Sequence, residues 1–414
     1  MSKEGKGILV VDVGTTKVCA LIGEEKEGKL WITGMGLVPS KGLKKGTIIN
    51  IDEATQSIKN AIEKAKSQAK VSLESVYTSI AGSHIKTLSG SGVIALKEKM
   101  VTTSDVEEVL SSAQTIELSQ DRVILHVIPQ EFIIDQTRGI IQPVGMSGIR
   151  LEANVQLVTC NRSALQNLLR CFENLGIEVD GVIVQGLASG EGVLTPEEKD
   201  LGVILIDLGG GTTDVAIYWD NVLRHIFSLP VGGELLTNDL AVGLRTSRTE
   251  AERIKIENGV CLRDLVEDDE IIEVAGTGDR PPKKISKKIL AEIIELRIKE
   301  LIEIIEKELY RQVFTDKDSF DIRSRIGSGI VITGGSALLP GLVYLFDQML
   351  DLPTRIGFPF KLAGLTQETQ HPQFATSVGM LLYAYNIQER TKEEKKESIV
   401  HKLKRSFVKL LKGG

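Results

Sequence analysis

Cysteine, aromatic residues and long apolar runs are all scarce in this sequence. Its 414 residues include four cysteines, two tryptophans and only 4% aromatic residues. The cysteines lie far apart, which argues against a zinc-type pair and against a small disulfide-linked fold, so we expect reduced thiols in a cytosolic protein. We find no apolar run long enough to span a bilayer and no signal-peptide pattern after Met1. The four positions are Cys19, Cys160, Cys171 and Cys261.

Excess positive charge is missing as well. The formal net charge is −6, and charged residues make up 26% of the chain. This balance argues against a nucleic-acid-binding surface over the whole body, and we predict no nucleic-acid partner. The hydrophobic content of 42% and the length are those of a globular chain with two or more domains and a large core.

The clearest motif is a glycine-rich segment between two apolar runs. Residues 203–206 and 215–219 are expected to be strands, and a hairpin tip with few side chains joins them. Backbone N–H groups at such a tip can converge on an anion, because no Cβ blocks the approach. Asp207, at the end of the first strand, is placed to hold a cation. The pattern predicts a site for a metal-chelated polyphosphate, and the tip residues are Gly209, Gly210, Gly211, Thr212 and Thr213.

A second copy of this motif lies near the start of the chain. Residues 8–22 again contain an apolar run, an aspartate, a glycine, two threonines and another apolar run. A self-similar element half a chain away indicates a duplicated architecture. Two hairpins could therefore hold one phosphate chain from opposite sides. The residues of this copy are Asp12, Gly14, Thr15, Thr16 and Lys17.

Three further segments could contribute to the same site, although each is also consistent with an ordinary glycine turn. A strand ends at Gln185 and a helix of small residues follows; Gly233 opens another helix; and a buried strand over 330–333 runs into Gly334, Gly335 and Ser336. The helix over 249–258 carries Glu252 and Lys255 on one face, either as a surface salt bridge or as ligand contacts.

Other parts of the chain follow a different pattern. Residues 84–159 are expected to form a small inserted subdomain with a helix near 104–117, capped by Thr103 or Ser104. His126 lies in a strand pattern of this block and is interpreted as a packed histidine, not a ligand. A long helix is expected from Ile285 to about Tyr310.

Taken together, the Asp12 and Asp207 hairpins, the 185–190 link, the Gly334 turn and the 375–379 helix resemble the five nucleotide-binding segments of the superfamily of actin, sugar kinases and heat-shock-chaperone ATPases. Within it, the chain is similar to the FtsA family of bacterial cell-division actin homologues. The resemblance implies an α/β fold: a duplicated actin-like ATPase fold with two halves around a nucleotide cleft, an inserted small α+β subdomain and a C-terminal amphipathic helix. The implied division is 1–83 with 161–198 and 357–389 as the first half, 84–160 as the insert, 199–240 with 300–356 as the second half, 241–299 as a small subdomain, 390–397 as a flexible linker and 398–414 as a membrane-targeting helix.

The same resemblance assigns roles around ATP and Mg²⁺. Residues 14–17 and 209–213 would hold the phosphates, and Asp12 and Asp207 would hold Mg²⁺ through water. Residues 334–336 with Glu252 and Lys255 would hold the adenosine, and Gly233 would lie near the ribose. Gln185, with Asp12 and Asp207, would position the attacking water, but related ATPases carry a glutamate near this point. Because an amide cannot accept the proton, we expect a weak ATPase at most, with ATP acting mainly as a conformational ligand.

The end of the chain carries an amphipathic pattern. A charged linker over 390–397 precedes a stretch with an apolar face and a basic face, which is typical of a helix lying in a membrane interface. The alternative is a helix docked on the body or on a partner protein. The predicted membrane-binding residues are Ile399, Val400, Leu403, Lys404, Arg405, Phe407, Lys409, Leu410 and Leu411.

Partners follow only from the resemblance. It implies filaments of the chain itself, anionic membrane lipids, the C-terminal tail of the tubulin-like FtsZ, and later division proteins, at the cytoplasmic side of the cell membrane and at the division site. A sugar or acetate kinase and a PilM-type pilus-assembly adaptor stay open as alternatives, although neither explains the tail. A heat-shock chaperone fits least, since no substrate-binding domain follows residue 389.

Overall fold

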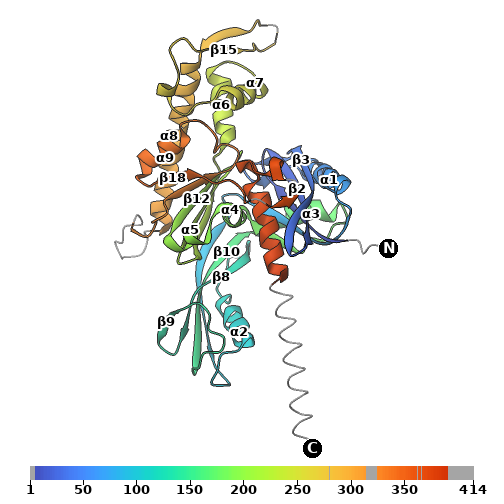
Figure 1. The fold of residues 1–414 in the computed structure, drawn as a ribbon, viewed down its shortest axis with the longest axis vertical. Helices are drawn as coiled ribbons and strands as arrows, with labels where there is room; N and C mark the ends of the chain where they lie inside the picture. Colours follow the sequence, from blue (N-terminus) through green and yellow to red (C-terminus); the bar gives the residue numbers. More distant parts are fainter. Residues whose placement is uncertain (1–4, 279, 314–323, 361, 365, 390–414) are drawn as a thin grey trace, which may run out of the picture.

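The computed structural model describes residues 5–278, 280–313, 324–360, 362–364 and 366–389. The predicted linker and amphipathic helix, 390–414, lie outside the described residues. Two large sheets with their helices form the centre of the molecule, and two smaller units lie at opposite ends of it (Figure 1).

The first sheet has six strands, in the order β11-β6-β1-β2-β3-β19. β1, β2 and β3 form an antiparallel meander, and β6 and β11 continue the sheet in parallel with β1. Its bounds are β1 Gly5–Val13, β2 Lys17–Lys26, β3 Lys29–Pro39, β6 Val71–Ile80, β11 Gly181–Val184 and β19 Ala363–Gly364.

The second sheet repeats this arrangement in the order β14-β13-β12-β17-β18. β12, β13 and β14 form the meander, and β17 and β18 run parallel to β12. Asp12 pairs with Cys19 across the first hairpin, and Asp207 pairs with Asp214 at the same place in the second. This common register confirms the predicted duplication. The bounds are β12 Val203–Leu208, β13 Thr213–Trp219, β14 Val222–Leu229, β17 Ile330–Thr333 and β18 Thr354–Ile356.

Helices cover both sheets, and helices together with the paired strands β15 and β16 form the small unit at the top of Figure 1. The predicted long helix begins at Lys287 and not at Ile285, because residues 283–286 pair as a strand with 271–274. The bounds are α1 Ile51–Gln68, α3 Arg162–Glu173, α4 Gln185–Val193, α5 Pro196–Leu201, α6 Gly233–Gly243, α7 Arg248–Asn258, α8 Lys287–Val313, α9 Leu342–Leu350, α10 Thr366–Thr369, a closing helix at 375–389, and the short strands β4 Leu43–Lys44, β5 Thr47–Ile48, β15 Ile271–Val274 and β16 Lys283–Ser286.

The insert is a separate four-stranded sheet in the order β7-β10-β8-β9, with α2 packed against it. It has its own small core, which includes Val109, Leu151 and Leu157. The predicted helix cap is wrong by one or two residues: Thr102 accepts the hydrogen bond from Asp105 N, and the helix ends at residue 113. The bounds are β7 Lys86–Ala95, α2 Thr103–Ala113, β8 Arg122–Ile134, β9 Thr137–Ile140 and β10 Arg150–Asn161.

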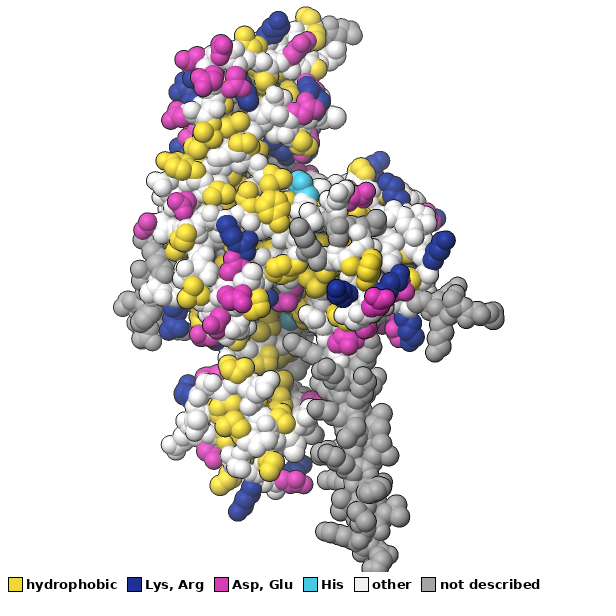
Figure 2. Space-filling view, viewed as in Figure 1, with side chains coloured by type: hydrophobic (Ala, Val, Ile, Leu, Met, Phe, Trp, Pro, Cys, Tyr) yellow, Lys and Arg dark blue, Asp and Glu magenta, His cyan; other side chains and the backbone are white. Residues whose placement is uncertain are grey.

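The structure shows the state of the cysteines, the apolarity of the helices and the distribution of surface charge in the part of the chain that it describes. All four cysteines are free and buried. Within the described ranges, we find no helix that is both long enough and apolar enough to traverse a bilayer. Acidic and basic side chains are interspersed over the described part of the face seen in Figure 2, where they form no continuous basic area.

α4 and the closing helix, which both lie in segments assigned to the first half, cross next to the second sheet. A Cβ on Gly379 would lie 1.7 Å from the carbonyl oxygen of Ala188, and one on Gly192 would lie 2.4 Å from that of Ala375. Backbone therefore touches backbone at this crossing. α4 also contacts strands of both sheets, so the crossing lies where the halves are joined.

Replacing Gly379 with alanine is expected to lower the free energy of unfolding by about 1–3 kcal/mol, because the added methyl group overlaps backbone that cannot move aside. Urea denaturation measures this loss. Gly335→Ala is the control, since a Cβ there meets no atom within 4 Å. A Gly379→Ala protein as stable as the control would contradict the tight crossing.

Candidate functional site

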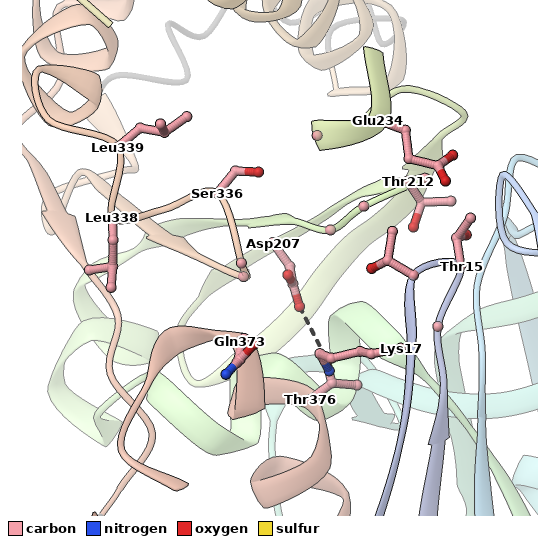
Figure 3. Close-up of a pocket in the computed structure, with 18 of the residues that line it drawn as sticks. Thr15, Lys17, Asp207, Thr212, Glu234, Ser336, Leu338, Leu339, Gln373 and Thr376 are labelled. Atoms are coloured by element: carbon pink, nitrogen blue, oxygen red, sulfur yellow. Dashed lines mark hydrogen bonds between the residues drawn. The ribbon is translucent and has the colours of Figure 1, made fainter. Parts of the chain in front are cut away.

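The tips of the two duplicated hairpins face one cavity of about 380 Å³ between the halves. Thr15, Thr212 and Glu234 lie at one end of the cavity, Leu338 and Leu339 lie at the other, and Asp207 lies between them (Figure 3). One end of the cavity is thus rich in hydroxyl groups and backbone amides, while the other is apolar.

The structure brings nearly all of the predicted site residues to this cavity. They come from both hairpins, the first turns of α4 and α6, α7 and the turn after β17. The predicted residues that line the cavity are Asp12, Gly14, Thr15, Thr16, Lys17, Gln185, Asp207, Gly209, Gly210, Gly211, Thr212, Gly233, Glu252, Lys255, Gly334, Gly335 and Ser336.

Thr213 is the exception. It is the first residue of β13, it is buried, and its hydroxyl donates to the carbonyl of Val231 at 2.9 Å. Side chains alternate along a strand, so with Thr212 on the cavity the Thr213 side chain points the other way. The expectation that the Thr213 side chain faces the phosphates does not agree with this geometry.

The hairpin tips touch each other across the cavity. A Cβ on Gly210 would lie 2.2 Å from Thr16 Cγ2, and one on Gly211 would lie 2.4 Å from Thr15 Oγ1. The amide of Gly46, in the turn between β4 and β5, donates to Thr15 Oγ1 at 2.9 Å and holds that side chain in place. Only glycine permits this approach, so the tips can surround a small anion from two sides.

Asp12 is the centre of a buried polar network. Lys17 Nζ lies 3.2 Å from its carboxylate, and Ser79 and Gln185 donate to it at 2.9 Å each. Burial alone would lower the pKa of Lys17, but the nearby Asp12, Cys19 and Asp207 together raise it above its ordinary value. Lys17 therefore stays charged at the hairpin tip, where it can contact a phosphate.

Asp207 occupies the matching place in the second half. Ser189 and Thr376 donate to its Oδ2 atom at 2.5 and 3.1 Å. Burial raises the pKa of this carboxyl group, and the nearby Asp12 raises it further. A bound cation would remove that penalty, because it pairs with the charge that burial disfavours.

The side chains at the cavity that could bind a metal ion indicate which metal would fit. No group of three or more histidine, cysteine, aspartate or glutamate side chains is arranged to hold a metal ion in the ranges that the structure describes. Two carboxylates beside a phosphate site suit Mg²⁺, which keeps several waters and takes its remaining ligands from phosphate. Asp12 and Asp207 fit such an ion and do not form a complete protein cage.

The sequence analysis missed Asp214, a third buried carboxyl group lining the cavity. Burial, with the Asp207 charge as a smaller cause, raises its pKa to about 7. The hairpin pattern contained a signal for Asp214, because this residue pairs with Asp207 across the hairpin. Other lining residues that were not predicted are Glu234, Ile256, Gly259, Leu338, Leu339, Pro340, His371, Gln373 and Thr376.

The raised pKa makes Asp214 a source of pH-dependent stability. Between about pH 4 and 7 the folded state binds a proton that the unfolded chain has lost, so the free energy of unfolding falls as pH rises through this range. Asp214→Asn is expected to lack this contribution, and its stability relative to the wild type should rise from pH 5 to pH 8 in urea titrations without nucleotide. Asp220→Asn, at an exposed carboxylate, should show no such trend. If the free energies of unfolding of Asp214→Asn and of the wild type changed with pH in parallel, the raised pKa of Asp214 would be refuted.

The apolar end of the cavity is suited to a flat ring. Gly334 has a φ of 92°, and a Cβ there would lie 2.4 Å from Asp207 Oδ1, so the turn after β17 requires glycine. Lys255 is a buried residue of the same cavity; its Nζ donates to Glu252 at 2.7 Å and to the carbonyl of Gly233 at 3.2 Å. The two residues therefore form an ion pair at the cavity wall, as one of the two interpretations of their spacing predicts, and contact with a ligand stays a prediction.

Two copies of one sheet, with paired hairpin tips at a shared cleft, define the actin-like class of folds. Solved structures agree. The chain is similar to a PilM-PilN type IV pilus biogenesis complex, with a TM-score of 0.62 and 14% identity over 92% of this chain and 98% of that one. It is also similar to MreB5 of Spiroplasma citri bound to ADP, with a TM-score of 0.55 and 14% identity over 94% and 98% of the two chains. At such identities the likeness shows the fold alone.

Sequence comparison is more specific. The family model for Cell division protein FtsA matches residues 204–379, and that for the SHS2 domain inserted in FTSA matches residues 82–159. Cell division protein FtsA of Pseudomonas aeruginosa is 42% identical over 92% of this chain and 90% of its own length. The same protein of Borreliella burgdorferi is 37% identical over 97% and 98%. The chain belongs to the FtsA family, a family of cell-division actin homologues, which decides against the kinase and pilus-adaptor alternatives.

Proposed function

We propose that this chain binds ATP with Mg²⁺, assembles into filaments and holds FtsZ polymers at the inner face of the cytoplasmic membrane. The observation that carries the nucleotide part is the contact of Gly210 and Gly211 with Thr16 and Thr15 at the cavity. Membership of the FtsA family supports the role in division.

In this proposal the hairpin tips bind the phosphates through backbone N–H groups and the hydroxyls of Thr15, Thr16 and Thr212, while Lys17 adds a positive charge. Asp12 and Asp207 hold Mg²⁺ through water, and the bound ion would neutralise phosphate charge. The apolar end near Leu338 and Leu339 takes the base.

Gln185 limits the chemistry in this proposal. Its Nε2 atom donates to Asp12 at 2.9 Å and to Ser79 at 3.0 Å, so the side chain is held at the base of the phosphate site. The amide can orient a water molecule but cannot accept its proton. We therefore propose slow hydrolysis, with ATP acting mainly to hold the two halves in one arrangement.

Membrane attachment would depend on residues 398–414. A single basic amphipathic helix binds an anionic surface weakly and reversibly. Many such helices on one filament bind far more tightly, because each attached subunit raises the effective concentration of the next. Polymerisation would thus switch membrane binding on.

The partners in this proposal follow from the family. The small subdomain over 241–299 would bind the C-terminal tail of FtsZ, and the insert would contact later division proteins. The chain would then be a peripheral protein at the cytoplasmic side of the division site.

Co-sedimentation with anionic liposomes, with and without ATP–Mg²⁺, tests the proposal when combined with negative-stain imaging. We expect lipid-bound filaments only when nucleotide is present. Nucleotide binding without filaments or lipid attachment would contradict the tethering role, and absence of nucleotide binding would contradict the assignment of the cavity.

A further inference from the structure

The insert is hydrogen-bonded to both halves of the molecule. On the second half, Thr87 Oγ1 donates to the carbonyl of Ile226 at 2.8 Å, and Gln130 Nε2 donates to that of Leu223 at 3.0 Å. On the first half, the amide of Val184 donates to His126 Nε2 at 3.2 Å. The insert therefore connects the two halves, and a change in the angle between the halves must act on these bonds.

The hydrogen bond from Val184 to His126 provides an acceptor for a buried backbone amide at the edge of the first sheet. Val184 is the last residue of β11, which is an edge strand, and it is the N-cap residue of α4 without a side-chain cap. A buried amide on an open strand edge needs an acceptor from outside the sheet. His126, on β8 of the insert, provides it. A protonated imidazole could not accept this bond, and burial lowers the pKa of His126 to about 4, so the ring is neutral near pH 7.

The residue after Val184 is Gln185, whose amide group is bonded to Asp12 and Ser79. Only one peptide unit therefore separates the insert's contact from a side chain that lines the nucleotide cavity. A displacement of Val184 therefore acts on a residue whose neighbour is held by two side-chain hydrogen bonds, so little backbone is available to absorb it before it reaches Gln185.

His126 is also connected to the cavity through the closing helix. The ring of His126 packs edge-on against Tyr383, with centroids 6.1 Å apart and planes at 87°. Tyr383 lies on the closing helix, whose first turn bears Thr376 and Ser377. Those hydroxyls donate to Asp207 at 3.1 Å and to Asp12 at 3.3 Å. Asp207 and Asp12 are thus linked to His126 through packed and hydrogen-bonded residues.

We propose that His126 is a positioning residue that couples the insert to the nucleotide cleft by holding Val184, and through it Gln185, in place. The coupling to nucleotide rests on the proposed function. Because coupling between two sites is reciprocal, a ligand that fixes Gln185 tightens the insert, and a partner that fixes the insert changes the affinity of the cleft for nucleotide.

Hydrogen–deuterium exchange of the full chain tests this with a pair of substitutions. His126→Met keeps the bulk and removes the acceptor, whereas His126→Gln places an amide oxygen near the former Nε2 atom. We expect residues 181–187 to exchange about tenfold faster in His126→Met, the effect of losing one hydrogen bond, and near the wild-type rate in His126→Gln. ATP–Mg²⁺ should slow exchange in residues 122–134 of the wild type and of His126→Gln, but not of His126→Met.

His225→Met is the matched control, because His225 lies on β14 next to the insert and its ring contacts Trp219, not Val184. It should keep the nucleotide response. Equal nucleotide protection of residues 122–134 in His126→Met and the wild type would overturn the proposal, and so would faster exchange of 181–187 in His126→Gln. Thermal unfolding of each variant separates these results from a general loss of folding.

The coupling can also be tested from Gln185 to the insert, and this test needs no nucleotide. Gln185→Leu removes the amide from Asp12, and we expect residues 122–134 to exchange faster in this variant without any ligand. An unchanged rate there would overturn the coupling even for a chain that binds no ATP. Failure of the wild type to bind ATP would instead contradict the proposed function, so the two failures are distinguishable.

Discussion

Replacing Asp207 with asparagine is expected to weaken binding of ATP–Mg²⁺ about 10–100-fold, the range found when a group that orients metal-bound ligands is removed. Binding of metal-free ATP should change little. The reason is the position of the carboxylate, which lines the cavity beside the glycine-rich tip of its own hairpin and is fixed by Ser189 and Thr376. Titration with a fluorescent ATP analogue, in Mg²⁺ and in EDTA, measures both affinities.

Although Asp207→Asn should weaken nucleotide binding, it should not lower the free energy of unfolding. Burial raises the pKa of Asp207, so its charge opposes folding, and the neutral amide should leave the apo protein at least as stable as the wild type. Asp220→Asn is the control, because Asp220 is exposed, pairs with Arg224 and does not line the cavity. An equal loss of affinity with and without Mg²⁺ would show that Asp207 does not act through the metal.

Deleting residues 398–414 is expected to reduce binding to anionic liposomes to the background of a vesicle-free sample and to leave nucleotide affinity unchanged. Each basic residue at an anionic surface contributes about 1 kcal/mol, and the apolar face adds the burial of its side chains. The deleted basic residues are Lys402, Lys404, Arg405, Lys409 and Lys412. Flotation of the protein with vesicles measures the bound fraction.

Two point variants separate the predicted amphipathic helix from the predicted linker. Phe407→Glu puts a charge among the predicted membrane-binding apolar residues and should release most of the protein, whereas Lys395→Glu, in the predicted linker, should release little. Binding should also weaken as salt increases, because screening reduces the electrostatic part. Membrane binding that persists after the deletion would contradict the proposed tether.

Much of this fold is readable in the sequence because the same pattern occurs twice. The apolar runs at 8–13 and 203–208 are too regular to be loops, and the aspartate, glycine and threonine residues after each one limit the choice to a tight hairpin. The strand-to-helix change at Gln185 and the turn at Gly334 were also predictable, since both depend on local sequence.

Features that depend on distant contacts could not be predicted in the same way. The strands β15 and β16 are only four residues long, so their pairing with each other, and not the β-propensity of either segment, determines that they form. Because 283–286 belong to β16, α8 begins at Lys287 and not at the predicted Ile285. The sequence predicts Thr213 in the hairpin tip, but β13 begins at Thr213, two residues before the predicted strand, and the Thr213 hydroxyl bonds to the carbonyl of Val231. The bond from Val184 to His126 joins residues 58 positions apart, and no local pattern indicates it.

The crossing of α4 with the closing helix also determines how the molecule can change shape. Sliding of packed helices is normally absorbed by small adjustments of side chains, but at Gly379 and Gly192 backbone meets backbone and there is no side chain to adjust. Rotation about the point of contact needs no such adjustment. We therefore expect the crossing to act as a pivot. The small unit around β15 lies at the end of the molecule away from the insert, which is bonded to both halves, so we expect a small rotation at the pivot to become a large displacement at this unit (Figure 1).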